Sequence, residues 1–279
     1  MTEVSYGPLP MERASLGPGH ELAYFRAGET GPPVLLVMGY CVPGRAWRFQ
    51  WPALAEHFQV ALFDNRGVGG TTAPPGPWTM KDLASDALRL LDHLGWDSAH
   101  VIGVSMGGMI AQRMALMSPE RVNSLSLIAT HAGGLRAVLP TVQGARHFLS
   151  ANLGDQDKRG AKVARLLFPD SFVEEIGFDW VSRVLQDDFT AVPDSRSRRW
   201  QLAAVLSHRT ARELHRLAHI PTLIIRPDAD LLVQPKQSDR LARLMPHARL
   251  ITLPNAGHGA IRQCAERINA ALIDHLRAS

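Results

Sequence analysis

The sequence predicts an α/β fold with a mostly parallel central sheet and helices on both faces. First, short runs of β-branched and other apolar residues recur without alternating polar positions, which is typical of strands buried on both faces. Second, segments with apolar residues at helical spacing separate most of these runs. Third, a length of 279 residues, with 46% hydrophobic and 20% charged residues, fits one globular core with an insertion.

The individual elements follow from these runs and from the residues that end them. The expected strands are 21–26, 34–38, 59–63, 100–104, 124–129, 222–225 and 250–253. The second expected helix is the best delimited, because Thr79 can cap its start and Gly95 ends it. The expected helices are 46–57, 80–94, 106–117, 235–244 and 260–277. In a parallel sheet of this kind, ligands bind beyond the carboxyl ends of the strands.

The alternation of strands and helices is interrupted after residue 129, and the next clear strand begins at residue 222. A helical crossover between parallel strands needs about 30 residues in all. Roughly 60 residues, from about Thr130 to His208, are therefore surplus to such a crossover. They have mixed apolar and charged positions, so we expect a mostly helical insertion on top of the sheet.

The composition argues against several classes of function. The net charge is +4, and the densest basic group is the short stretch Ser195-Arg-Ser-Arg-Arg-Trp200, whereas a nucleic-acid surface needs a basic stripe with interleaved aromatics. The two cysteines, Cys41 and Cys264, are too few for a disulfide framework or a cysteine zinc site. We therefore expect no nucleic-acid partner, no metal and no organic cofactor.

The sequence also predicts a cytoplasmic protein without a membrane span. No apolar run reaches the roughly 18–20 residues that cross a bilayer. The N-terminal residues lack the basic start and the apolar core of a signal peptide. The sequence contains no coiled-coil or edge-pairing pattern, so it leaves the oligomeric state open.

The stretch Gly103-Val-Ser-Met-Gly107 joins a buried strand to a helix. Such a sharp turn holds its serine in a strained backbone conformation with the hydroxyl clear of the sheet. The two glycines allow the strand and the helix to approach closely. The N–H of Met106 lies in the first helical turn, where it has no intrahelical partner and can donate to an oxyanion. Ser105 is therefore the candidate nucleophile, with Met106 as one oxyanion donor.

A serine hydroxyl needs a general base at neutral pH. Among the twelve histidines, His258 is our choice, because it follows the last strand in the small-residue loop 253–259. His131, after the strand 124–129, and His208, at the end of the insertion, are its rivals.

A carboxylate must then fix the tautomer of the histidine and stabilise its charged form. The stretch Ile225-Arg-Pro-Asp-Ala-Asp-Leu231 offers two carboxylates after a buried strand. We predict that Asp230 has this role, with Asp228 as the alternative. The loop after the strand 34–38 is expected to supply the second oxyanion donor, because Gly39 lets the backbone bend and directs the N–H of Tyr40 into the site.

Together these residues resemble the α/β-hydrolase superfamily, and the resemblance covers nearly the whole chain. Asp64-Asn-Arg-Gly-Val-Gly-Gly-Thr71 is similar to a loop of the family's small-molecule hydrolases in which the arginine is structural, which implies that role for Arg66. The stretches 199–204 and 220–225 look like a branch that contains polyketide methyl esterases and enol-lactone hydrolases. The insertion corresponds to the family's cap. This implies a core of residues 1–130 and 209–279 and a helical cap, or lid, of residues 131–208.

Three positions depart from the family pattern. The oxyanion loop has Met38-Gly39 where the family often has His-Gly, but the backbone donor does not need that histidine. The strand before the acid ends in Arg226-Pro227 where the family often has His-Gly, which affects the placement of Asp230. Ser105 stands where dehalogenases and epoxide hydrolases carry an aspartate, which argues against both reactions.

The resemblance implies a serine hydrolase that cleaves a small-molecule carboxylic ester or lactone through an acyl-enzyme. The same triad also supports carbon–carbon bond hydrolysis, thioester hydrolysis, perhydrolysis or lyase chemistry. The alternative outside catalysis is a ligand receptor built on the same fold. The expected substrate-binding residues are Gly39, Trp47, Trp180 and Trp200. The other cap aromatics, which can equally form the core of the cap, are Phe148, Phe172 and Phe178.

Overall fold

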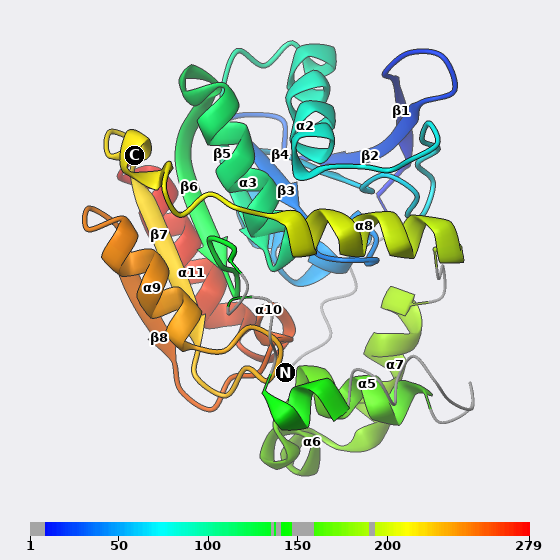
Figure 1. The fold of residues 1–279 in the computed structure, drawn as a ribbon, viewed down its shortest axis with the longest axis vertical. Helices are drawn as coiled ribbons and strands as arrows, with labels where there is room; N and C mark the ends of the chain where they lie inside the picture. Colours follow the sequence, from blue (N-terminus) through cyan, green and yellow to red (C-terminus); the bar gives the residue numbers. More distant parts are fainter. Residues whose placement is uncertain (1–8, 135–136, 138–140, 147–158, 190–192) are drawn as a thin grey trace.

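The computed structural model describes residues 9–134, 137, 141–146, 159–189 and 193–279, and these form a sheet of eight strands (Figure 1). The strand order is β1-β2-β4-β3-β5-β6-β7-β8. β1 and β2 pair antiparallel, as do β2 and β4, and every pair from β4 to β8 is parallel. The strands are β1 Glu12–Ser15, β2 Glu21–Ala27, β3 Pro33–Val37, β4 Gln59–Phe63, β5 Ala99–Val104, β6 Val122–Ile128, β7 Thr222–Pro227 and β8 Arg249–Leu253.

Helices cover both faces of this sheet, as the sequence predicts. One face packs against α2 Met80–Leu94, α3 Met106–Met117, the 3₁₀ helix η4 Leu214–Leu217 and α9 Lys236–Leu244. The other face packs against η1 Gly44–Phe49, α1 Trp51–Ala55, α10 Ala260–Gln263 and α11 Ala265–Arg277. A short 3₁₀ turn, η2 Pro119–Arg121, connects α3 to β6.

Strand β3 explains why the strand sequences do not alternate. Leu35 and Val37 belong to the core beneath α2 and α3, whereas Val34 and Leu36 belong to the core on the opposite face. All four side chains are fully buried. Because both faces of the sheet are covered, every position of the strand has to be apolar.

Most predicted element bounds agree with the structure within two residues, and three features differ. β1 was not predicted. The expected helix 46–57 is split into η1 and α1, since Pro52 can begin a helix but cannot continue one. The expected helix 260–277 is interrupted at Cys264. By contrast, α2 begins at a capping box of Thr79 with Asp82 and ends at the left-handed Gly95, as the sequence indicates.

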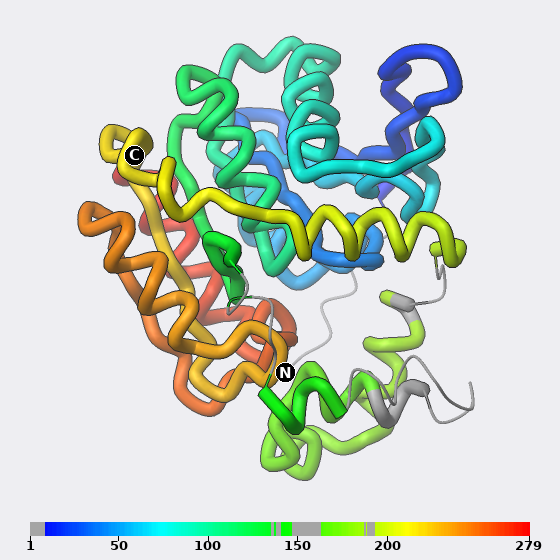
Figure 2. Tube along the Cα trace, viewed as in Figure 1, coloured from blue at the N-terminus to red at the C-terminus, as the bar shows by residue number. Residues whose placement is uncertain are grey.

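The chain between β6 and β7 contains α5 Arg159–Leu167, α6 Asp170–Ile176, α7 Phe178–Phe189 and α8 Ser195–Ser207. Helices α5, α6 and α7 share a small apolar core and are grouped to one side of the sheet, whereas α8 lies apart from them and contacts α2 (Figures 1 and 2). Within the described ranges, no helix is long and apolar enough to cross a membrane.

Candidate active site

Ser105 lies on the sharp turn between β5 and α3. Its backbone has φ 54° and ψ −120°, which is a strained region for a residue with a side chain. A Cβ atom on Gly103 would lie 2.4 Å from the carbonyl oxygen of Gly107, and one on Gly107 would lie 2.0 Å from that of Val37. Both positions therefore require glycine, and the strand and the helix approach as closely as the sequence predicts.

The loop after β3 reaches the same serine. A Cβ atom built on Gly39 would lie 3.3 Å from Ser105 Cβ and 3.8 Å from its Oγ. The next N–H along the loop belongs to Tyr40. Among the described residues, neither this N–H nor that of Met106 donates to a protein acceptor. Two unused amide donors therefore belong to the segments that meet at Ser105.

Asp230 and His258 form a hydrogen-bonded pair. His258 Nδ1 lies 2.7 Å from Asp230 Oδ2, and the Asp230 side chain is fully buried. The other carboxylate oxygen accepts from the N–H groups of Leu232 and Val233 at 2.8 and 2.9 Å. A carboxylate with these partners accepts a hydrogen bond from Nδ1–H, which leaves His258 Nε2 without a proton when the ring is neutral.

The alternative acid and the alternative bases lie in different environments. Asp228 is exposed, two residues before Asp230. His131 and His208 are buried with ring centroids 6.1 Å apart. Burial lowers the pKa of His131 to about 4 and that of His208 to about 3. His131 Nδ1 also accepts from the N–H of Gly133 at 3.0 Å. Because burial disfavours the charged form of each ring, both histidines are neutral near pH 7.

No hydrogen bond joins Ser105 to His258 within the described residues. Both residues follow parallel strands at the carboxyl edge of the sheet, Ser105 after β5 and His258 after β8. Catalytic hydrogen bonds are often long in unliganded enzymes and tighten when substrate binds.

The aromatic residues expected at the substrate lie in three different places. Trp47 is fully buried in the core beneath α1 and α11, so it is a core residue. Trp180, on α7, contacts Phe172 and Phe49 with ring centroids at 6.0 and 6.3 Å. Trp200, on α8, packs against Gly76, where an added Cβ would lie 2.4 Å from the indole ring.

Of the other cap aromatics, Phe178 is 46% exposed and Phe148 lies outside the described residues. In the described part of the chain, no ring contact or hydrogen bond joins Ser105 to any of these aromatic side chains.

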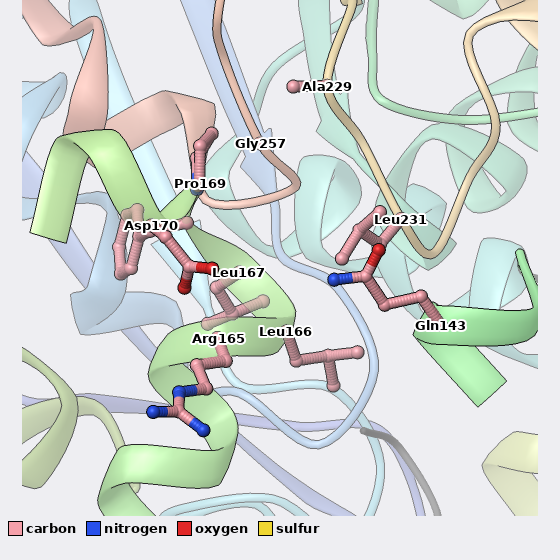
Figure 3. Close-up of a pocket in the computed structure, with 10 residues that line it drawn as sticks. Gln143, Arg165, Leu166, Leu167, Pro169, Asp170, Ala229, Leu231 and Gly257 are labelled. Atoms are coloured by element: carbon pink, nitrogen blue, oxygen red, sulfur yellow. The ribbon is translucent and has the colours of Figure 1, made fainter. Parts of the chain in front are cut away.

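A cavity of about 160 Å³ lies where the chain between β6 and β7 meets the loops of Asp230 and His258 (Figure 3). Ala229 and Leu231, on either side of Asp230, line it together with Gly257, beside His258. The remaining lining residues come from the segment between β6 and β7: Gln143, Arg165, Leu166, Leu167, Phe168, Pro169 and Asp170. Gly259 N–H also donates to the carbonyl of Leu167 at 2.8 Å, which attaches α5 to the His258 loop.

Two buried polar residues, Asp188 and Gln201, were not found by sequence reasoning. Asp188, on α7, forms ion pairs with Arg48 and Arg262, which connect that helix to the core. Gln201, on α8, accepts from the N–H of Cys41. The only sequence signal for Gln201 is its place in the family-like stretch 199–204. Arg66 forms an ion pair with Asp86 on α2, in keeping with a structural role. The described residues contain no group of three potential metal ligands.

A mostly parallel sheet of this order, with a strained serine on the turn after β5, defines the α/β class of hydrolases. A family model described as the alpha/beta hydrolase fold matches residues 32–261, and the chain belongs to this family.

Similar proteins have differing names. The chain is 30% identical over 277 residues to the dihydrolipoyllysine-residue acetyltransferase component of the acetoin cleaving system of Pseudomonas putida, covering 97% of this chain and 70% of that one. It is 29% identical to RutD of Stutzerimonas stutzeri (strain A1501), named as a carbamate hydrolase, covering 92% and 96%. The enol-lactonase structure from Burkholderia xenovorans LB400 is 25% identical with a TM-score of 0.80, covering 95% and 100%.

Proposed function

We propose that the protein is a serine hydrolase that cleaves a small-molecule carboxylic ester or lactone. Ser105 is the nucleophile, His258 the general base and Asp230 the acid that orients it. The observation that carries this proposal is the 2.7 Å contact between a fully buried carboxylate and His258 Nδ1. It directs an unprotonated Nε2 away from the carboxylate, as a base for serine requires.

In the first half of the reaction, Ser105 Oγ attacks the substrate carbonyl carbon while His258 Nε2 takes the hydroxyl proton. The oxyanion accepts hydrogen bonds from the N–H groups of Tyr40 and Met106. His258 then returns the proton to the leaving oxygen as the carbon–oxygen bond breaks, and an acyl-enzyme remains. In the second half, His258 takes a proton from water, the water oxygen attacks the acyl carbon, and Ser105 is released with its proton restored.

Residues 131–208 are proposed as the cap over this site. Three features support this role. Helices α5, α6 and α7 have a separate apolar core, and the carbonyl oxygen of Leu167 accepts a hydrogen bond from Gly259 in the His258 loop. In addition, this region shares a cavity with the loops of Asp230 and His258. A cavity of about 160 Å³ suits a small group of the substrate or product. Gly39 and the cap residues Trp180 and Trp200 stay proposed substrate contacts.

The resemblance to an enol-lactonase structure favours an ester or lactone, which share the attacked carbonyl. A carbamate is the second candidate, favoured by the RutD relative. Its carbonyl can acylate the same serine, but it places nitrogen on the attacked carbon and so gives a less reactive substrate.

The first test is hydrolysis of p-nitrophenyl acetate, butyrate and octanoate by the wild type and by Ser105→Ala. We expect turnover by the wild type and its loss in the variant, because the acyl-enzyme cannot form. Ser126→Ala is the matched control, since Ser126 is fully buried on β6 and its Oγ has no hydrogen-bond partner among the described residues. Turnover that survives in a folded Ser105→Ala protein would remove the serine mechanism.

A further inference from the structure

Two buried side-chain amides hold the loop that carries the Tyr40 N–H. On one side, Asn65 Nδ2 donates to the carbonyl oxygen of Met38 at 2.8 Å. On the other side, the N–H of Cys41 donates to Gln201 Oε1 at 2.9 Å. The peptide group that presents the Tyr40 N–H therefore lies between two peptide groups that are fixed by side chains.

Gln201 connects three separate parts of the molecule. It is fully buried on α8, and both polar atoms of its amide have partners. While Oε1 accepts from Cys41, Nε2 donates to the carbonyl oxygen of Arg66 at 2.9 Å. Arg66 is itself tied to α2 by its ion pair with Asp86. The oxyanion loop, the loop after β4 and α8 are thus joined through one side chain.

The backbone at Cys41 needs such support. Cys41 has φ 58°, and a residue with a side chain is strained in this left-handed region. A second contact from α8 acts on the same loop, because the Tyr40 hydroxyl donates to the carbonyl oxygen of Arg198 at 3.1 Å. Both contacts come from a helix about 160 positions further along the chain.

We propose that Gln201 is a positioning residue for the oxyanion hole. By holding the Cys41 amide, it fixes the orientation of the preceding amide, that of Tyr40, toward the carbonyl oxygen of a substrate on Ser105. This role rests on the proposed function, because the Tyr40 N–H has an oxyanion to bind only if Ser105 attacks a carbonyl. Helix α8, within the proposed cap, is then required for a complete oxyanion hole.

The test compares two substitutions at this position. Gln201→Met keeps the volume but removes both hydrogen bonds. We expect kcat for p-nitrophenyl butyrate to fall about ten-fold with KM within about two-fold, since a displaced oxyanion donor acts mainly in the transition state. Gln201→Glu keeps an acceptor for Cys41. As an ionised group it repels the Arg66 carbonyl, whereas the protonated carboxyl donates to that carbonyl and restores both bonds.

The kcat of Gln201→Glu relative to the wild type should therefore rise as the pH is lowered from about 9 to 6, because burial favours the neutral form of a carboxyl. The ionisable residues joined to Gln201 directly or through its partners in the described structure include Cys41, Tyr40, Arg198 and Arg66, and Arg66 in turn lies near Asp86 and Asp82.

Gln50→Met is the matched control. Gln50 is also fully buried, and its Nε2 donates to the carbonyl oxygen of Ile261 on α10 rather than to a group of the oxyanion loop. We expect it to lower the melting temperature without a selective loss of kcat. Hydrogen exchange of the backbone segment 39–42 gives a readout independent of activity, and it should be faster in Gln201→Met than in the wild type.

A folded Gln201→Met protein with wild-type kcat and unchanged exchange in this segment would overturn the role of Gln201. An equal loss of kcat in Gln50→Met would do the same, since it would reflect general destabilisation. If Ser105→Ala is inactive in the same assay, the serine mechanism stands whatever Gln201 does. If Ser105→Ala keeps its activity, the proposed function falls and the role of Gln201 falls with it.

Discussion

Two histidine sites at the carboxyl edge of the sheet differ in the partners that surround them. His258 is hydrogen-bonded to the buried carboxylate of Asp230. His131 and His208 face each other at 6.1 Å. Within the described residues, the hydrogen-bond partners of their ring nitrogens are the N–H of Gly133 and the hydroxyl of Thr210, and neighbouring arginines further oppose a positive charge on either ring. A carboxylate stabilises an imidazolium ion, whereas a neutral buried environment opposes it. A position at this edge of the sheet therefore does not by itself make a histidine a suitable base.

The largest expected effect is the difference in hydrolytic activity between a variant of His258 and variants of His131 and His208. Replacing the proposed base, in His258→Ala, should lower kcat by about 10⁴-fold or more, because proton transfer from Ser105 is lost. His131→Ala and His208→Ala should keep most of the activity, since neither ring can easily take up a proton. Steady-state hydrolysis of p-nitrophenyl butyrate measures all three. A comparable loss in either rival variant would reopen the assignment of the base.

The second expected effect tests Asp230, whose carboxylate distinguishes the site of His258 from that of His131 and His208. Asp230→Asn removes the charge that fixes the tautomer of His258 and stabilises its protonated form, and we expect kcat to fall roughly 10⁴-fold. Asp228→Asn is the control in the same loop, and it should have little effect because Asp228 is exposed. The reverse order of the two losses would mean that Asp228 is the acid.

The smallest expected effect is on the free energy of unfolding, and it arises from His131 and His208, which are neutral in the folded protein. The pKa values of His131 and His208 lie at about 4 and about 3 in the folded protein, below the ordinary value of 6.5. Between pH 6.5 and 4 the unfolded chain therefore binds more protons than the folded one, so the free energy of unfolding decreases as the pH falls through this window. The slope for each group is at most about 1.4 kcal/mol per pH unit.

Urea unfolding at pH 7 and at pH 5 measures this effect. His131→Asn keeps an acceptor near the position of Nδ1, and His208→Gln keeps a donor near the position of Nε2. Each variant should lose less stability than the wild type between the two pH values, even if it is less stable at pH 7. The interpretation of the pair as neutral structural histidines fails if both variants show the same pH dependence as the wild type.

The parts of the fold that follow from nearby residues were predicted well from the sequence. The apolar runs indicate strands covered on both faces, and β4 and α3 have the predicted bounds. The turn at Ser105 belongs to the same group, because Gly103 and Gly107 are adjacent to it in the chain. The split of the predicted helix 46–57 was missed because the effect of Pro52 depends on where in a helix it falls.

Side-chain partners that are distant in sequence were harder to predict. The sequence offers both Asp228 and Asp230 after one strand, and only the tertiary structure places one of them, Asp230, against His258 from 28 positions away. Trp47 was predicted near the substrate, whereas it lies in the core, since an aromatic residue suits either place.

The sequence by itself determined the alternation of strands and helices and the strained serine turn, because both depend on backbone preferences and apolar spacing within a few residues. Only the tertiary structure decided which aspartate meets His258 and that Gln201 of α8 holds the loop of Tyr40. The physical reason is that a hydrogen bond requires two atoms within about 3 Å of each other. For residues 160 positions apart, only the packing of the whole sheet and its helices sets that distance.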